Sequence, residues 1–142
     1  MTQPDRATFV TIDGSITSID VVHQKIAELW LEYPWIGLVD RMALETALIE
    51  LVTNIIRYAL REEGARAEMR LLVGDSEMRA EVTDRGHEFS GDLKHLAMPP
   101  PQAESGRGLA VIDSLVDVFE YTRRARRNRW TIVRRLSVGG AS

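Results

Sequence analysis

A long amphipathic stretch in the first half of the chain constrains the fold more than any other feature. Between about Arg41 and Arg61, apolar residues recur every three or four positions, which is the period of an α-helix. They form one broad stripe of Leu44, Ala47, Leu48, Leu51, Val52, Ile55, Ile56 and Ala59. Asp40 stands where an N-cap is expected, and Gly64 follows as a stop signal. The pattern predicts a long helix with one face in the core.

Elsewhere the chain changes between the helical period and the two-residue period of strands. In chain order we predict a strand over 8–12, a helix over 18–31, the long helix, a hairpin over 67–73 and 78–82, a helix over 109–116, and a hairpin over 119–123 and 130–136. The inward residues of the first helix are predicted to be Val21, Val22, Ile26, Ala27 and Trp30. This order predicts an α+β two-layer sandwich: a mostly antiparallel, mixed β-sheet with about three helices on one face.

Size and composition exclude several classes of protein. With 142 residues, the chain is predicted to be a single domain over 1–142. Its net charge of −3 argues against a nucleic-acid-binding polycation, and no apolar run approaches the ~20 residues of a membrane span. The absence of cysteine excludes disulfides, thiolate zinc sites and cysteine nucleophiles. No signal peptide is visible. We therefore expect a cytoplasmic protein that contacts neither nucleic acid nor membrane directly.

The long helix carries a polar stripe next to its apolar face. On that stripe Glu50 and Asn54 lie one turn apart, so that a carboxylate and an amide oxygen project side by side. Two such oxygens can hold a hard cation or orient a water, with Glu50 as a base. Taken alone, the pair is a weak signal, and a solvated helix face with ordinary surface charges is the stronger interpretation.

Two further motifs follow in the irregular segment 84–108. Asp84-Arg85-Gly86 ends a predicted strand, where a carboxylate can accept a hydrogen bond from an exocyclic amine and a glycine admits a flat ring. Gly106-Arg107-Gly108-Leu109 stands before a predicted helix, where backbone N–H groups can hold phosphates. Each motif alone also fits simple turn chemistry.

The three motifs together, in this order, resemble the N, G1 and G2 boxes of the GHKL ATPase superfamily, which has the Bergerat fold. The resemblance covers roughly residues 13–136. Its most specific pieces are Ile49-Glu50-Leu51-Val52-Thr53-Asn54 with Tyr58, Asp84-Arg85-Gly86 with Phe89, and Gly106-Arg107-Gly108-Leu109.

The resemblance implies ATP and Mg²⁺ as ligands, and a role for each motif. Asn54 is expected to coordinate Mg²⁺ on the triphosphate, and Glu50 to be the general base that prepares the attacking hydroxyl. Asp84 is expected to accept a hydrogen bond from the adenine amino group, and Gly86 is expected to leave room for the adenine base. Thr131 is expected near the adenine.

The last motif is expected to contact the phosphates. The resemblance implies that Gly106 and Gly108 present backbone donors, with Arg107 and Leu109 in the same contact segment. The segment 90–105 is then the ATP lid. Related proteins often carry an arginine before the first glycine, where this chain has Glu104-Ser105.

Within the superfamily, the chain is similar to the anti-sigma-factor serine kinases of bacterial partner-switching systems, the RsbW type. Such a kinase phosphorylates a STAS-type anti-sigma-factor antagonist and sequesters a sigma factor. One alternative is a nucleotide-gated binding module without kinase turnover. Another is the catalytic fragment of a histidine kinase, with its phosphoacceptor on a separate chain. The resemblance also implies a homodimer, for which the strand over 8–12 is the candidate pairing element.

Arginines crowd the turn of the last predicted hairpin, at Arg123, Arg124, Arg126, Arg127 and Arg129. One interpretation is that their charges protect an edge strand from pairing. The other is a docking surface for an acidic partner. Nucleic acid is a weaker alternative, because no aromatic residues are interleaved with the arginines.

Overall fold

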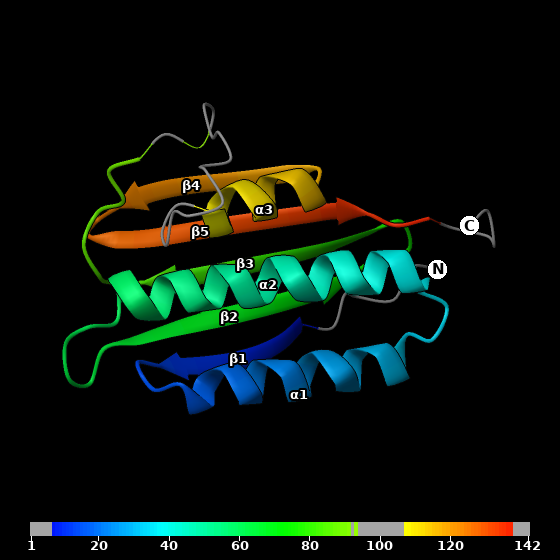
Figure 1. Ribbon diagram of the computed structural model, residues 1–142, viewed down its shortest axis with the longest axis horizontal. Helices are drawn as coiled ribbons and strands as arrows, with labels where there is room; N and C mark the ends of the chain where they lie inside the picture. The colour runs from blue at the N-terminus through cyan, green and yellow to red at the C-terminus, as the bar shows by residue number, and fades with distance from the viewer. Residues whose placement is uncertain (1–6, 92, 94–106, 138–142) are drawn as a thin grey trace.

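The computed structural model describes residues 7–91, 93 and 107–137, which form a five-stranded sheet with three helices on one face (Figure 1). The elements are β1 (Ala7–Asp13), α1 (Thr17–Glu32), α2 (Leu38–Tyr58), β2 (Arg66–Val73), β3 (Glu77–Asp84), α3 (Arg107–Leu115), β4 (Val118–Arg124) and β5 (Arg127–Arg135). The predicted α+β two-layer sandwich is confirmed. Within the described ranges, no helix has the length and apolarity to cross a membrane.

The strands follow the order β1-β2-β3-β5-β4, and all four pairings are antiparallel rather than mixed. β1 and β4 are therefore the two edges of the sheet. The register pairs Ala67 on β2 with Asp84 on β3, and Asp84 with Asn128 on β5. The beginnings of β2 and β5 and the end of β3 thus meet at one end of the sheet.

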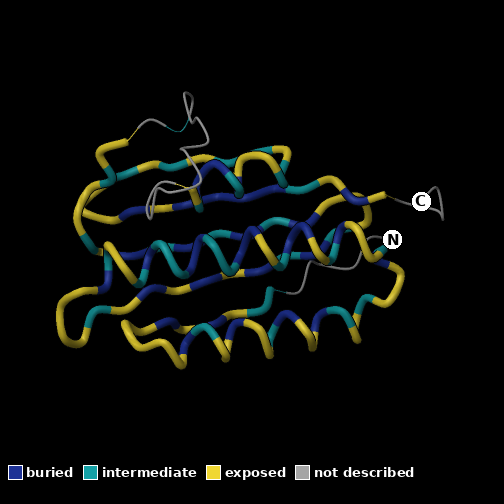
Figure 2. Tube along the Cα trace, in the orientation of Figure 1, coloured by how far each residue is buried: buried dark blue, intermediate teal, exposed yellow. Residues whose placement is uncertain are grey.

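The core lies between the sheet and its helices. Buried positions recur along α2 and run through the central strands (Figure 2). The predicted stripe of α2 is confirmed, since Leu44, Leu48 and Leu51 are fully buried. The stripe of α1 is partly wrong. Its buried residues are Ser18, Val22, Ile26 and Leu29, whereas Val21 and Ala27 are exposed. The buried face follows the i, i+4, i+8 series that starts at Ser18 and is therefore rotated from the predicted one.

The predicted N-cap role of Asp40 is wrong. α2 begins at Leu38, so that Asp40 lies inside the first turn and is buried. Its Oδ1 accepts a hydrogen bond from Arg134 Nε at 2.9 Å, and its Oδ2 accepts one from the backbone N–H of Ser137 at 2.9 Å. Arg134 also donates to the carbonyl of Leu115 at the end of α3. Asp40 therefore ties together α2, β5 and, through Arg134, α3.

The last hairpin is tighter than predicted. Ala125 and Arg126 have positive φ angles of 52° and 63° and form a two-residue turn between β4 and β5. β5 therefore begins at Arg127, three residues before the predicted start. This shift brings Asn128 into the sheet opposite Asp84.

Candidate functional site

A pocket of about 390 Å³ opens between the C-terminal part of α2, the ends of β3 and β5, and the start of α3. Three of the residues predicted to bind ligand line it, namely Asn54, Asp84 and Leu109. They come from three segments that are far apart in the sequence. Asn128 and Trp130 of β5 complete the wall on the sheet side.

One carboxylate oxygen of Asp84 accepts hydrogen bonds from the protein, and the other is available to a ligand. The residue is 2% exposed. Its Oδ1 accepts hydrogen bonds from the backbone N–H of Gly86 at 2.7 Å and from Asn128 Nδ2 at 2.8 Å. Its Oδ2 is buried without a hydrogen-bond partner among the residues that the structure describes. An unpaired buried carboxylate oxygen is costly, so this atom is suited to accept a hydrogen bond from a ligand.

Asn128 holds the carboxylate of Asp84 in this orientation. Its Nδ2 donates to Asp84 Oδ1 and to the carbonyl of His87, the latter at 2.9 Å. Its Oδ1 accepts hydrogen bonds from the Tyr121 hydroxyl at 2.5 Å and from Arg123 NH1 at 2.8 Å. The amide oxygen of Asn128 thus faces two donors, and its NH₂ group faces acceptors. This pattern fixes the orientation of the amide.

An aromatic cluster supports the loop that follows β3. Phe89 packs edge-on against Trp130, with ring centroids 5.1 Å apart, and against Tyr121 at 5.4 Å. The backbone N–H of Phe89 donates to the Tyr121 hydroxyl at 2.9 Å. Because Phe89 and Trp130 both line the pocket, it offers a flat apolar group a wall beside the polar Asp84.

Gly86 allows the loop after β3 to pass directly over the end of α2. A Cβ atom at Gly86 would lie 2.6 Å from the carbonyl oxygen of Ala59 and 2.8 Å from its Cβ. The sequence predicted that this glycine makes room for a base. In the structure the close approach is to Ala59, which itself lines the pocket. Any side chain at Gly86 would displace the loop that carries His87 and Phe89.

The motif on α2 meets the motif at the start of α3. A Cβ atom at Gly108 would lie 2.8 Å from Glu50 Oε2, so the Glu50 carboxylate rests against the glycine backbone. Helix α3 begins at Arg107, two residues earlier than predicted. The N–H groups of Gly108 and Leu109 therefore belong to a first helical turn, where backbone donors have no intrahelical acceptor and the helix dipole favours anions.

Some predicted residues lie elsewhere. Thr131 is not among the pocket-lining residues; strand alternation turns it to the opposite face from Trp130, and Asn128 stands beside Asp84 instead. Gly106 and most of the predicted lid lie outside the described residues. Arg107 is exposed at the start of α3.

Sequence reasoning missed Asn128, Tyr121 and Arg123. These three form the network behind Asp84. In the sheet Asn128 lies opposite Arg123 and Asp84, and Tyr121 lies opposite Trp130. The predicted start of the last strand at residue 130 concealed the two pairings of Asn128.

No group of three His, Cys, Asp or Glu residues within the described part of the chain could hold a metal ion by itself. Glu50 and Asn54 remain as oxygen-bearing side chains one turn apart on α2. Mg²⁺ is commonly bound by one or two protein oxygens together with substrate phosphates, so the donor set fits a metal that arrives with a nucleotide.

Comparisons with known proteins agree with this geometry. The crystal structure of the RsbU and RsbW domains of Rv1364c from Mycobacterium tuberculosis matches 96% of this chain with 23% identity and a TM-score of 0.65, and this chain spans only 34% of that one. The Acinetobacter baumannii histidine kinase AdeS matches 93% of this chain and 69% of its own, with 17% identity and a TM-score of 0.53. At these identities the likeness concerns the fold. Among curated proteins, none matches the sequence.

The match to a family model is more informative. The model of the histidine kinase-like ATPase domain covers residues 20–134 of this chain. That range runs from α1 to β5 and includes Glu50, Asn54, Asp84 and Gly108. Family membership implies ATP binding, which agrees with a pocket that pairs a free buried carboxylate oxygen with an aromatic wall. The chain belongs to the histidine kinase-like ATPase domain family.

Proposed function

We propose that this chain is an ATP-dependent serine/threonine protein kinase and anti-sigma factor of a bacterial partner-switching system. In this role it phosphorylates a STAS-type anti-sigma-factor antagonist and sequesters a sigma factor. The observation that carries the proposal is the contact of the Glu50 carboxylate with the backbone at Gly108. It brings a general base to the helix start that is suited to bind phosphates. The likeness to a chain with an RsbW domain supports the choice of substrate class.

Each residue then has a defined task. The free Oδ2 of Asp84 accepts a hydrogen bond from the adenine amino group, and Asn128 keeps that oxygen in place. The N–H groups at the start of α3 hold phosphate oxygens. Glu50 accepts the proton of the attacking serine or threonine hydroxyl. Mg²⁺ held by Asn54 supplies positive charge that offsets the charge of the phosphates.

The experiment is a phosphoryl-transfer assay with radiolabelled ATP and the antagonist domain encoded nearest to this gene. Glu50→Gln keeps the shape of the side chain and removes the base. We expect it to bind ATP normally and to lower transfer by roughly 100-fold or more. Glu45→Gln is the matched control, because Glu45 lies on the same helix and pairs with His23 at 3.0 Å, outside the pocket.

The outcomes separate two functions. Wild-type transfer by Glu50→Gln would show that the catalytic assignment is wrong. A wild-type protein that binds ATP, changes its partner with nucleotide state and transfers no phosphate would be a nucleotide-gated binding module. The sequence has Glu104-Ser105 where relatives often have an arginine. This difference is the observation that favours the second function.

A further inference from the structure

A second groove adjoins the nucleotide pocket at the same end of the molecule. It encloses about 490 Å³ and shares Tyr58, Ala59, His87 and Glu88 with the pocket. Its lining includes five arginines, and we call it the arginine groove: Arg61, Arg66, Arg85, Arg123 and Arg126. Arg123 also belongs to the network behind Asp84, whereas the other four arginines have no role in the pocket described above.

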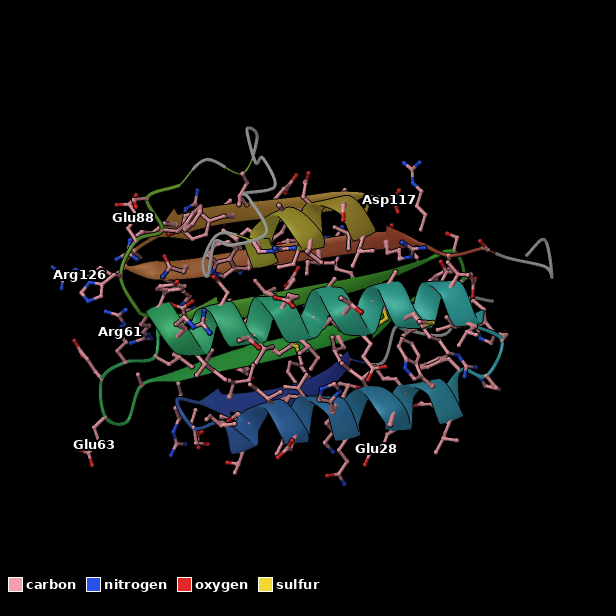
Figure 3. The ribbon with its side chains drawn as sticks, viewed as in Figure 1. Glu28, Arg61, Glu63, Glu88, Asp117 and Arg126 are labelled. Carbon is pink, nitrogen blue, oxygen red and sulfur yellow. The ribbon has the colours of Figure 1, made fainter. Side chains whose placement is uncertain are left out.

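The five arginines come from five places in the sequence. Arg61 follows α2, Arg66 begins β2, and Arg85 follows β3, while Arg123 lies on β4 and Arg126 in the turn before β5. The antiparallel register brings these segments to one end of the sheet. Figure 3 shows Arg61 and Arg126 at this end, with Glu88 on the loop beside them.

None of the five arginines forms an ion pair within the part of the chain that the structure describes. Arginines elsewhere do so: Arg70 and Arg79 pair with Glu81, and Arg134 pairs with Asp40. The five arginines outnumber the three glutamates that line the same groove, and gathering an excess of one charge costs free energy in the isolated protein. An anionic partner would offset that cost.

Protection of a sheet edge does not account for this arrangement. β4 is an edge strand, but Arg66 and Arg85 flank β2 and β3, which lie inside the sheet. Arg61 is on the connection from α2. Edge protection therefore explains at most the arginines of the last hairpin.

We propose that the arginine groove binds an acidic segment of a partner protein beside the mouth of the nucleotide pocket. Guanidinium groups bind carboxylates through two parallel hydrogen bonds, which suits a row of Asp and Glu side chains. Glu62, Glu63 and Glu88 also line the groove, so the acidic segment must place its carboxylates opposite the arginines and away from these three side chains. The net charge of −3 gives the whole molecule no long-range attraction for nucleic acid.

The test is the fluorescence anisotropy of a labelled poly-glutamate peptide, measured without nucleotide so that its result does not depend on the proposed kinase activity. A poly-glutamine peptide and a single-stranded DNA oligonucleotide are the comparison probes. We expect the wild type to bind poly-glutamate in preference to both, and the affinity to fall as salt is raised.

Two variants remove charge from the groove without touching the pocket. Arg85→Glu reverses an exposed charge, and Arg126→Asn removes one while keeping a residue that tolerates positive φ. We expect each to weaken poly-glutamate binding roughly tenfold. Arg135→Glu is the control, because Arg135 is exposed at the other end of β5.

An equal loss in Arg135→Glu would mean that only overall charge matters, and would overturn the proposal. Absence of poly-glutamate binding by the wild type would do the same. Tighter binding of the oligonucleotide, lost in the same two variants, would assign the groove to nucleic acid instead. Unchanged ATP affinity in both variants is the check that the fold and the pocket are intact.

Discussion

Asp84 and Asn128 are placed to select the ligand of the pocket, because one oxygen of the Asp84 carboxylate has no hydrogen-bond partner among the described residues. Asn128 engages the other oxygen and is itself fixed by Tyr121 and Arg123. A base with an exocyclic amine satisfies the free oxygen, whereas a base with a carbonyl at that position leaves it unpaired. We therefore interpret Asn128 as a positioning residue for base selectivity.

This interpretation predicts the effect of Asn128→Ala. Without the amide, the Asp84 carboxylate can rotate, so we expect ATP affinity to fall about tenfold. We also expect the preference for ATP over inosine triphosphate to shrink, which a mere loss of stability would not cause. Competition with a fluorescent nucleotide measures both values. Thr122→Ala, at an exposed position of β4, is the control. An unchanged preference would contradict the positioning role.

The sequence predicted those site residues whose motif partners lie only a few positions away in the chain. Glu50 with Asn54 and Asp84 with Gly86 are close in sequence, so spacing alone revealed them. Asn128 acts only through a cross-strand pair 44 residues from Asp84. Such a partner can be found only when the start of the strand is predicted correctly.

Among the elements, α2 is anchored at its start by Asp40 and Arg134. An aspartate near the start of a predicted helix fits both an N-cap just before the first turn and an ion pair within it, so the sequence could not distinguish the two roles. The partner lies 94 residues away on β5, beyond any local pattern. By contrast, the apolar stripe of the same helix was predictable, because burial follows directly from a 3.6-residue period.

Asp40→Ala removes a buried carboxylate and leaves Arg134 without its charge partner. The Asp40 side chain is 4% exposed and that of Arg134 is 20% exposed. We expect the free energy of unfolding to fall by about 3 kcal/mol in urea denaturation. Asp20→Ala, at an exposed position of α1, is expected to change it by less than about 0.5 kcal/mol. Equal effects would refute the anchoring role of Asp40.

The junction of β1 and α1 gives a pH-dependent prediction. Hydrogen bonds from Ser15 and then Ser18, with a smaller contribution from the charge of Arg66, lower the pKa of Asp13 from 3.8 to about 2. A lowered pKa stabilises the fold above the unfolded-state value, and that contribution is lost as the pH falls through the folded-state value.

We therefore expect the advantage of the wild type over Asp13→Asn to be full above pH 3.8 and to disappear as the pH falls toward about 2. Thermal melting of both proteins across this range is the measurement. A constant difference between them at every pH would mean that the carboxylate charge plays no part.

For the whole molecule, we propose a homodimer that pairs through the open edge of β1. Among the strands that the structure describes, β1 pairs with β2 alone, and Phe9 on this strand is 59% exposed. We expect light scattering to give the mass of a dimer, and Phe9→Lys to shift it toward a monomer because a charge on an edge strand opposes pairing. Ile16→Lys, at a site that is 79% exposed beyond the strand, is the control. A monomeric wild type would remove this proposal.

The arrangement of layers was predictable because hydrophobic period and chain order already limit how hairpins and helices can pack. The common end of β2, β3 and β5 was not, because it depends on register and on the tight turn at Ala125 and Arg126. That end carries both the nucleotide pocket and the arginine groove, so the features that sequence reasoning missed are concentrated there.

Binding of adenine at the free oxygen of Asp84 is tested by calorimetric titration of the protein with ATP and Mg²⁺. Asp84→Asn replaces the anionic acceptor with an amide. We expect ATP affinity to fall roughly tenfold or more, which corresponds to a charge-assisted hydrogen bond of about 1.5–3 kcal/mol. Asp75→Asn, in the turn between β2 and β3, is expected to bind like the wild type. Equal ATP affinity for the wild type and Asp84→Asn would show that adenine does not bind at Asp84.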